Sequence, residues 1–126
     1  MRKFARVAYT LFAWIFVLGV AVQVFLVGLV VIAGQMGWDA HINLGHSLGL
    51  PLILMVVSMY VGGLSKEIKR LTWLLFGVYL FQADFVIFLR DSVPAAAALH
   101  PVIALVDFSV GWLLASKALE HLRATP

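Results

Sequence analysis

The chain has 126 residues, of which 63% are hydrophobic and 12% are charged, and its formal net charge is +3. A soluble domain carries roughly a quarter charged residues, so this composition excludes a water-soluble globule, and the length predicts a single domain over residues 1–126. The absence of cysteine excludes disulfides, iron–sulfur clusters and thiolate metal sites.

Four apolar segments follow one another along the chain. The first runs from about residue 7 to 33, which is too long for the h-region of a cleaved signal peptide, of roughly 7–15 residues. The others run from about 41 to 64, 71 to 89 and 96 to 116. Each is close to the roughly 20 residues that a helix needs to cross the hydrocarbon core. The sequence therefore predicts an all-α, up-down-up-down bundle of four transmembrane helices.

Glycines and prolines mark where these helices begin, end or bend. Gly34 and Gly37 follow the first apolar segment and break it from the second. Pro94 suits a first helical turn, where no amide donor is missed. Pro51 lies inside the second segment and is expected to kink it, whereas Pro101 either kinks the fourth helix or marks its late start.

Basic residues are distributed unequally between the two sides of the predicted membrane. Eight of the nine fall on the side of the chain ends and of the loop between the second and third segments: Arg2, Lys3, Arg6, Lys66, Lys69, Arg70, Lys117 and Arg123. Only Arg90 falls on the other side, beside Asp91. Cytoplasmic loops carry an excess of lysine and arginine. This asymmetry predicts a multi-pass protein of the inner (plasma) membrane with both termini cytoplasmic, in contact with lipid and without a nucleic-acid partner.

Polar side chains inside hydrocarbon are costly, so each one needs a partner or a function. The candidates are Gln23, His41, Asn43, His46, Gln82, Asp84, His100 and Asp107. Three of the four histidines begin the second and fourth segments, at the outer side. Neutral imidazoles on facing helices of a bundle suit a haem, because one ring nitrogen binds iron while a hydrogen bond holds the other.

His100 is expected to be one axial ligand of a single b-type haem, with either His41 or His46 as the other. Counting from the inner basic residues at about 1.5 Å per residue puts His46 nearer the level of His100, although helix tilt keeps His41 open. Gly45 and Gly49 flank His46 and would let a flat macrocycle lie against the backbone. The same spacing equally lets two helices pack closely, and each histidine equally suits a hydrogen bond to water or to another helix.

Carboxylates and amides form a second group of candidates. Asp107 shares a helix face with the histidine seven residues before it, within about 20°. Gln82 and Asp84 lie near the outer end of the third segment, where a carboxylate can bond a ligating imidazole from the second coordination shell. Asp84 can equally pair with Arg90. Gln23 is expected to form a hydrogen bond between helices.

Several short stretches resemble a family of small bacterial four-helix membrane proteins with no established activity. These stretches are Gln23–Leu29, Trp38–Gly45, Ala98–Val102 and Ala104–Leu105. The resemblance covers most of the chain. It favours His41 as the partner of His100, whereas the count of residues from the inner basic residues favours His46. The His-x-x-x-Gly opening of the second segment is also similar to membrane cytochromes b of the ferric-reductase and copper-resistance type. Since the additional paired histidines of those multi-haem proteins are missing here, this resemblance implies at most one haem.

Three functions remain open at this point. The first is a one-haem protein that transfers single electrons or senses haem near the outer face, with a quinone or a larger respiratory complex as partner. The second is a structural or accessory subunit of a membrane complex, and the third is a small transporter or channel component with Gln82, Asp84 and Asp107 along a polar path. The sequence has no nucleophile–base pair and no phosphate-binding loop, so no catalytic activity of its own is predicted. Homo-oligomerisation is compatible with all three.

Overall fold

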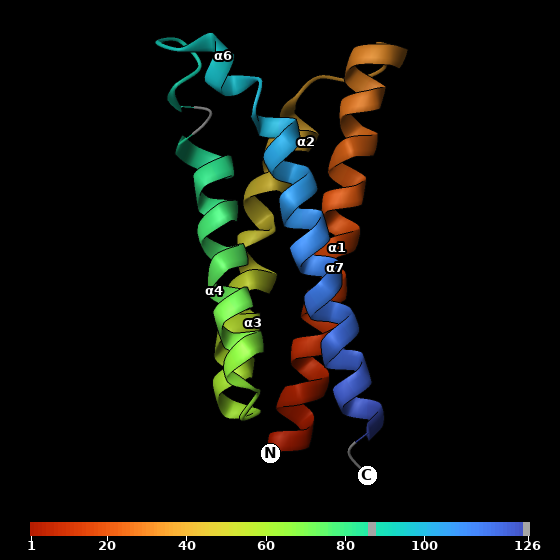
Figure 1. Ribbon diagram of the computed structural model, residues 1–126. Helices are drawn as coiled ribbons and strands as arrows, with labels where there is room; N and C mark the ends of the chain where they lie inside the picture. The colour runs from red at the N-terminus through yellow and green to blue at the C-terminus, as the bar shows by residue number, and fades with distance from the viewer. Residues whose placement is uncertain (86–87, 125–126) are drawn as a thin grey trace.

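The computed structural model describes residues 1–85 and 88–124, and within these residues the chain is helical, without strands. The described helices pack side by side as a bundle (Figure 1). Their elements are α1 (Arg2–Gly28) with the π-helical turn η1 (Leu29–Ala33), α2 (Asp39–Ser47) with α3 (Gly49–Val61), α4 (Lys66–Leu80) with the π-helical turn η2 (Phe81–Phe85), and the short α6 (Pro94–Ala97) followed by α7 (His100–Ala124). The predicted all-helical class with four segments is confirmed.

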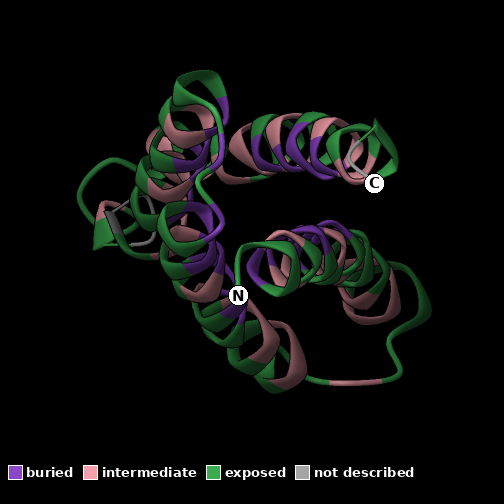
Figure 2. Ribbon diagram, turned by 90° about the horizontal axis from the view of Figure 1, so that it is seen from below, coloured by how far each residue is buried: buried purple, intermediate pink, exposed green. Residues whose placement is uncertain are grey.

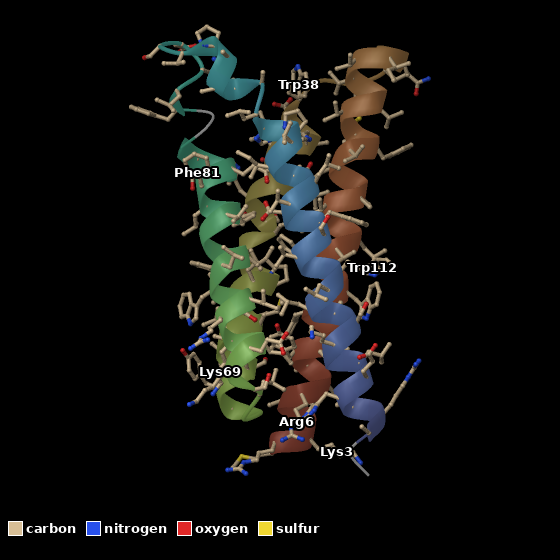
Figure 3. All side chains as sticks on the ribbon, in the orientation of Figure 1. Lys3, Arg6, Trp38, Lys69, Phe81 and Trp112 are labelled. Carbon is tan, nitrogen blue, oxygen red and sulfur yellow. The ribbon has the colours of Figure 1, made fainter. Side chains whose placement is uncertain are left out.

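The helices alternate in direction, so the chain ends and the turn between α3 and α4 lie together. The basic residues of these segments make the two ends of the bundle differ in charge. Both chain ends and the turn between α3 and α4 lie at one end, which we call the basic end (Figure 1). Figure 3 shows Lys3, Arg6 and Lys69 there, and Lys117 forms an ion pair of 3.0 Å with Glu67 at the same end. The opposite end carries the link from α1 to α2 and the start of α7. We call it the histidine end, because His41 near the start of α2 and His100 at the start of α7 lie there.

Within residues 1–85 and 88–124, three helices are long and apolar enough to cross a membrane: Arg2–Val31, Asp39–Val61 and Pro94–Ala124. Their outward surfaces carry large exposed apolar side chains such as Leu18, Leu50 and Leu105, which suit contact with lipid. The fourth predicted span, 71–89, includes residues 86 and 87, which lie outside the described residues. The described part of that segment is α4 with η2.

Helix ends differ from the predicted segments for local reasons. α7 continues to Ala124, well beyond the apolar stretch, because a helix can extend past the hydrocarbon wherever its residues are good helix formers. The second segment is divided at Leu48, three residues before Pro51. Proline lacks the amide hydrogen and crowds the carbonyl four residues earlier, so the break follows from Pro51. Pro101 lies in the first turn of α7 and marks its late start.

The packed core fills the bundle from the basic end to about its middle. α1 and α4 each pack against both α3 and α7, so α1 and α4 lie diagonally across the bundle. Figure 2 shows the buried residues on the inward sides of the helices. A hydrogen bond of 2.6 Å joins the hydroxyls of Tyr9 and Thr72 across this diagonal. Fully buried side chains around it include Phe16, Met59 and Leu114.

The histidine end lacks such a core. No described residue of α1 after Val20, of α2, or of α7 before Asp107 is buried. The side chains at this end are therefore more exposed than those around the Tyr9–Thr72 pair. This more exposed end is where the predicted site residues gather.

Candidate functional site

His41 and His100 face each other at the histidine end. Their ring centroids are 6.1 Å apart, and the ring planes meet at 67°. His41 lies in the first turn of α2, and His100 is the first residue of α7. Trp38, which precedes α2 and is visible at this end in Figure 3, contacts His41 edge to face, with centroids 5.7 Å apart. The pair thus joins two helical segments that are far apart in the sequence.

The hydrogen bond of His100 determines which of its ring nitrogens is available. Its Nδ1 lies 3.3 Å from the backbone carbonyl oxygen of Gln82. A carbonyl oxygen only accepts, so Nδ1 must carry the hydrogen and donate. The neutral ring then keeps its lone pair on Nε2. Imidazoles that bind metals are typically held in this way, by a hydrogen bond from the nitrogen that does not bind the metal.

His41 has a buried ring nitrogen with nothing to bond to in the described part of the chain. Its Nδ1 is shielded from solvent and has no hydrogen-bond partner among the described residues. Leaving a buried polar atom unsatisfied costs about 1–3 kcal/mol. A hydrogen-bond donor or a metal ion bound to this nitrogen would remove that cost, so His41 is suited to a ligand that the described residues do not supply.

His46 lies on the surface of α2, and the structure does not bring it to the other two histidines. Its side chain is exposed, and its Nδ1 lies 2.9 Å from the carbonyl oxygen of Ile42. His46 follows His41 by five residues, which turns it about 140° around the helix. The two rings therefore cannot face the same neighbour, and the depth count, which favoured His46, ignored this rotation.

The space beside Gly45 and Gly49 is filled by side chains of the protein itself. A Cβ added to Gly45 would lie 2.7 Å from Nε2 of Gln23, and one added to Gly49 would lie 3.3 Å from the hydroxyl of Tyr79. Both glycines thus let α1 and α4 approach the second segment closely. This is the packing role that the Gly-x-x-x-Gly spacing also predicted.

Tyr79 is a site residue that the sequence reasoning missed. Its hydroxyl donates to the carbonyl oxygen of Gly45 at 2.8 Å and lies 3.2 Å from that of His46. These carbonyls belong to the last turn of α2, beside the break before Pro51. The sequence signal was a tyrosine in the middle of the predicted apolar segment 71–89, where a hydroxyl usually needs a partner.

Buried polar atoms without a hydrogen-bond partner come from each of the four helical segments. Besides Nδ1 of His41, the described residues include Oε1 of Gln23, Oε1 of Gln82 and Oδ1 of Asp107. Asp107 as a whole is only 2% exposed. All four residues lie in the half of the bundle toward the histidine end. This half therefore offers acceptor atoms to a bound group or to water.

Asp84 does not take part in this interior. Its side chain is exposed, and Arg90 forms its ion pair with Asp91, at 3.2 Å. The two neighbouring side chains of Asp91 and Arg90 are both well exposed, so this pair contributes little to stability.

A metal site built from many protein ligands is not found in the described residues. No group of three or more histidine, cysteine, aspartate or glutamate side chains in residues 1–85 and 88–124 is arranged to hold a metal ion. What the histidine end offers is a pair of imidazoles on facing segments. Such a pair suits an ion whose other ligands come with a cofactor.

Comparison with known proteins identifies one family. The profile of a family of unknown function (DUF6220) matches residues 23–86, a range that includes Gln23, His41 and Gln82 but not His100. No curated protein and no solved structure gives a match. The expected resemblance to a small family without established activity agrees with this match, whereas the similarity to membrane cytochromes b gains no support from it.

Proposed function

We propose that this chain, which belongs to the family of unknown function (DUF6220), binds one b-type haem between His41 and His100. The proposal is carried by the facing pair of imidazoles, whose ring centroids are 6.1 Å apart. A metal–imidazole bond is about 2 Å long. Imidazoles at this separation could therefore both hold one iron, which would be supplied by the haem.

The surrounding residues fit such a group. His100 presents its Nε2 lone pair because its Nδ1 is held by the Gln82 carbonyl, and His41 has a ring nitrogen without a partner in the described residues. Among the described residues, the histidine end has no buried apolar core that a macrocycle would have to displace. Gly45 and Gly49 are already in contact with Gln23 and Tyr79, so the macrocycle would contact other parts of the second and fourth segments.

A bound haem would supply one-electron exchange between ferric and ferrous iron. The chain's own contribution would be to hold the iron with His41 and His100 and to fix the His100 ring through the Gln82 carbonyl. Trp38 covers one side of His41. With the basic end in the cytoplasm, this site lies near the outer face of the inner membrane. The function is then single-electron transfer or haem sensing there, as part of a larger respiratory or redox complex.

The absorption spectrum of the purified protein, expressed with ample haem, tests this proposal. Two neutral imidazoles give a low-spin iron with sharp bands in the reduced state. We expect His100→Ala and His41→Ala each to abolish these bands or to leave a five-coordinate iron. His46→Ala is the matched control, because His46 lies on the same helix with its ring exposed, and its spectrum should match that of the unmodified protein.

Two results would contradict the proposal in different ways. A folded protein without a Soret band would exclude the haem and leave the structural-subunit function. Loss of the bands in His46→Ala, but not in His41→Ala, would keep the haem and move its ligand to the surface of α2.

A further inference from the structure

The protein holds the two facing imidazoles unequally. Nδ1 of His100 donates to the carbonyl oxygen of Gln82 at 3.3 Å, which fixes the orientation of that ring. The His41 ring contacts the rings of Trp38 and His100, but its Nδ1 has no hydrogen-bond partner among the described residues. A ligating imidazole is normally fixed by a hydrogen bond from the nitrogen that does not bind the metal. His100 is therefore the better fixed of the two.

The helices that carry the two rings are also anchored to different extents. α7 continues from His100 into the packed core, where Leu114 and Ala118 are buried. α2 has nine residues, none of them buried, and it is separated from α3 at Leu48. Elements with few buried apolar contacts open at a lower free-energy cost than the core does. We therefore expect α2 and His41 to move away from the pair more readily than α7 and His100.

Tyr79 restrains this movement. Its hydroxyl donates to the carbonyl oxygen of Gly45 at 2.8 Å. Gly45 follows His41 by four residues, so this bond holds α2 about one turn from the imidazole. Gln82, whose carbonyl holds His100, comes three residues after Tyr79 on the same segment. The third segment thus holds both imidazoles, His100 directly and His41 through the next turn of its helix.

We propose that His41 is the exchangeable ligand of the haem site, that a neutral diatomic gas takes its place on the iron, and that Tyr79 is the positioning residue that limits this exchange. This inference rests on the proposed function and assigns it to haem-based sensing. With carbon monoxide, the bond between iron and His41 breaks and leaves its electron pair on the imidazole. The gas donates an electron pair to the iron instead, so nothing is oxidised or reduced.

Charge and cover at the histidine end favour a small neutral ligand. Eight of the nine lysines and arginines belong to the basic end, and the ninth, Arg90, is paired with Asp91, so the charge here does not favour an anion. Trp38 covers one side of His41, which favours a small molecule. Release of His41 would let α2 move, and this links gas binding to the position of a helix.

Carbon monoxide tests which imidazole is exchanged. The reduced protein is mixed with the gas, and the absorption and resonance Raman spectra of the complex are compared with those of the His41→Ala and His100→Ala complexes. We expect the complex of the unmodified protein to match that of His41→Ala, in which His100 is the remaining axial imidazole. A match to His100→Ala, or a haem that binds no carbon monoxide, would overturn the proposal.

The binding rate tests the role of Tyr79. Carbon monoxide binds to molecules in which His41 has left the iron, so the rate reports their fraction. Tyr79→Phe should raise it about fivefold, as the loss of one hydrogen bond between membrane helices implies. Tyr9→Phe is the matched control, because Tyr9 is also buried and loses a hydrogen bond, to Thr72, but outside α2. It should leave the rate unchanged, and equal rates for the two variants would overturn the positioning role.

Hydrogen exchange of the haem-free protein gives a readout that does not depend on iron. Tyr79→Phe should speed the exchange of the backbone amides of α2, whereas Tyr9→Phe should not. Unchanged exchange in α2 of Tyr79→Phe would contradict the proposed restraint. An unmodified protein without a Soret band would contradict the proposed haem and this inference together. A protein with the haem whose carbon monoxide complex matches His100→Ala would contradict this inference alone.

Discussion

Asp107 carries a carboxyl group into the interior of an apolar bundle. It is 2% exposed, and its Oδ1 has no hydrogen-bond partner among the described residues. It also shares a helix face with His100, as the seven-residue spacing predicted. A polar group at such a position is expected to serve a bound group or water in the same half of the bundle, since a polar residue inside a membrane protein is costly without one.

We therefore expect Asp107→Asn to leave more folded protein and more bound haem than Asp107→Leu. The amide keeps most of the hydrogen-bonding capacity of the carboxyl, whereas leucine has none. Unfolding in detergent and the haem absorption of each variant measure the difference. Ser109→Leu is the control, because Ser109 is an exposed polar residue of the same helix. A leucine variant that is more stable than the unmodified protein and binds as much haem would show that Asp107 is not a needed polar partner.

The break between α2 and α3 is stabilised by another helix. Pro51 interrupts the hydrogen bonds of the second segment, and Tyr79 from α4 donates to the carbonyl of Gly45 at the break. Gly49 leaves room for the tyrosine ring, with 3.3 Å between its added Cβ and the hydroxyl. The bend in one helix and the aromatic residue in another thus form one unit, which also determines where α2 and His41 lie.

Tyr79→Phe should destabilise the protein by about 1 kcal/mol, the scale of a hydrogen bond between membrane helices. The ring remains, so the packing against Gly49 is kept and only the hydroxyl is lost. Thermal unfolding in detergent measures this change. Tyr60→Phe is the matched control: its hydroxyl accepts a hydrogen bond from Trp73, but on the exposed surface, and its loss should cost less. Equal shifts for both variants would mean that the Tyr79 hydroxyl does not stabilise the break.

The molecule as a whole has one basic end and one histidine end, and both chain ends lie at the former (Figure 1). Eight of the nine lysines and arginines belong to segments at the basic end. The positive-inside rule then predicts the orientation of the entire bundle, because the helices alternate in direction and one assignment fixes the others.

Reporter fusions test this orientation. A reporter fused after residue 126 should be active only if it works in the cytoplasm, whereas one inserted in Gln35–Asp39 should behave as external. The control is the same reporter in the turn between α3 and α4, which should match the C-terminal fusion. An external C-terminus would contradict both the predicted number of spans and the placement of the histidine site at the outer face.

Much of the fold follows from local properties of the sequence. The length of each apolar run and the charges between runs predict four helical segments, since a backbone in hydrocarbon must satisfy its hydrogen bonds within a helix or a barrel. Pro51 likewise predicts a kink in the second segment, and Pro101 predicts either a kink in the fourth helix or its late start. His100 is a candidate from the sequence because it begins a segment at the side opposite the basic clusters.

Only the tertiary structure shows which residues meet. Depth along a helix can be counted from the sequence, but rotation about the helix axis depends on how the helix packs, so counting favours His46 while the structure brings His41 to His100. From the sequence, Gly45 and Gly49 could make room either for a macrocycle or for close helix packing. Only the structure shows that Gln23 and Tyr79 fill this space. These contacts join residues distant in sequence, and their geometry depends on the packing of all four segments together.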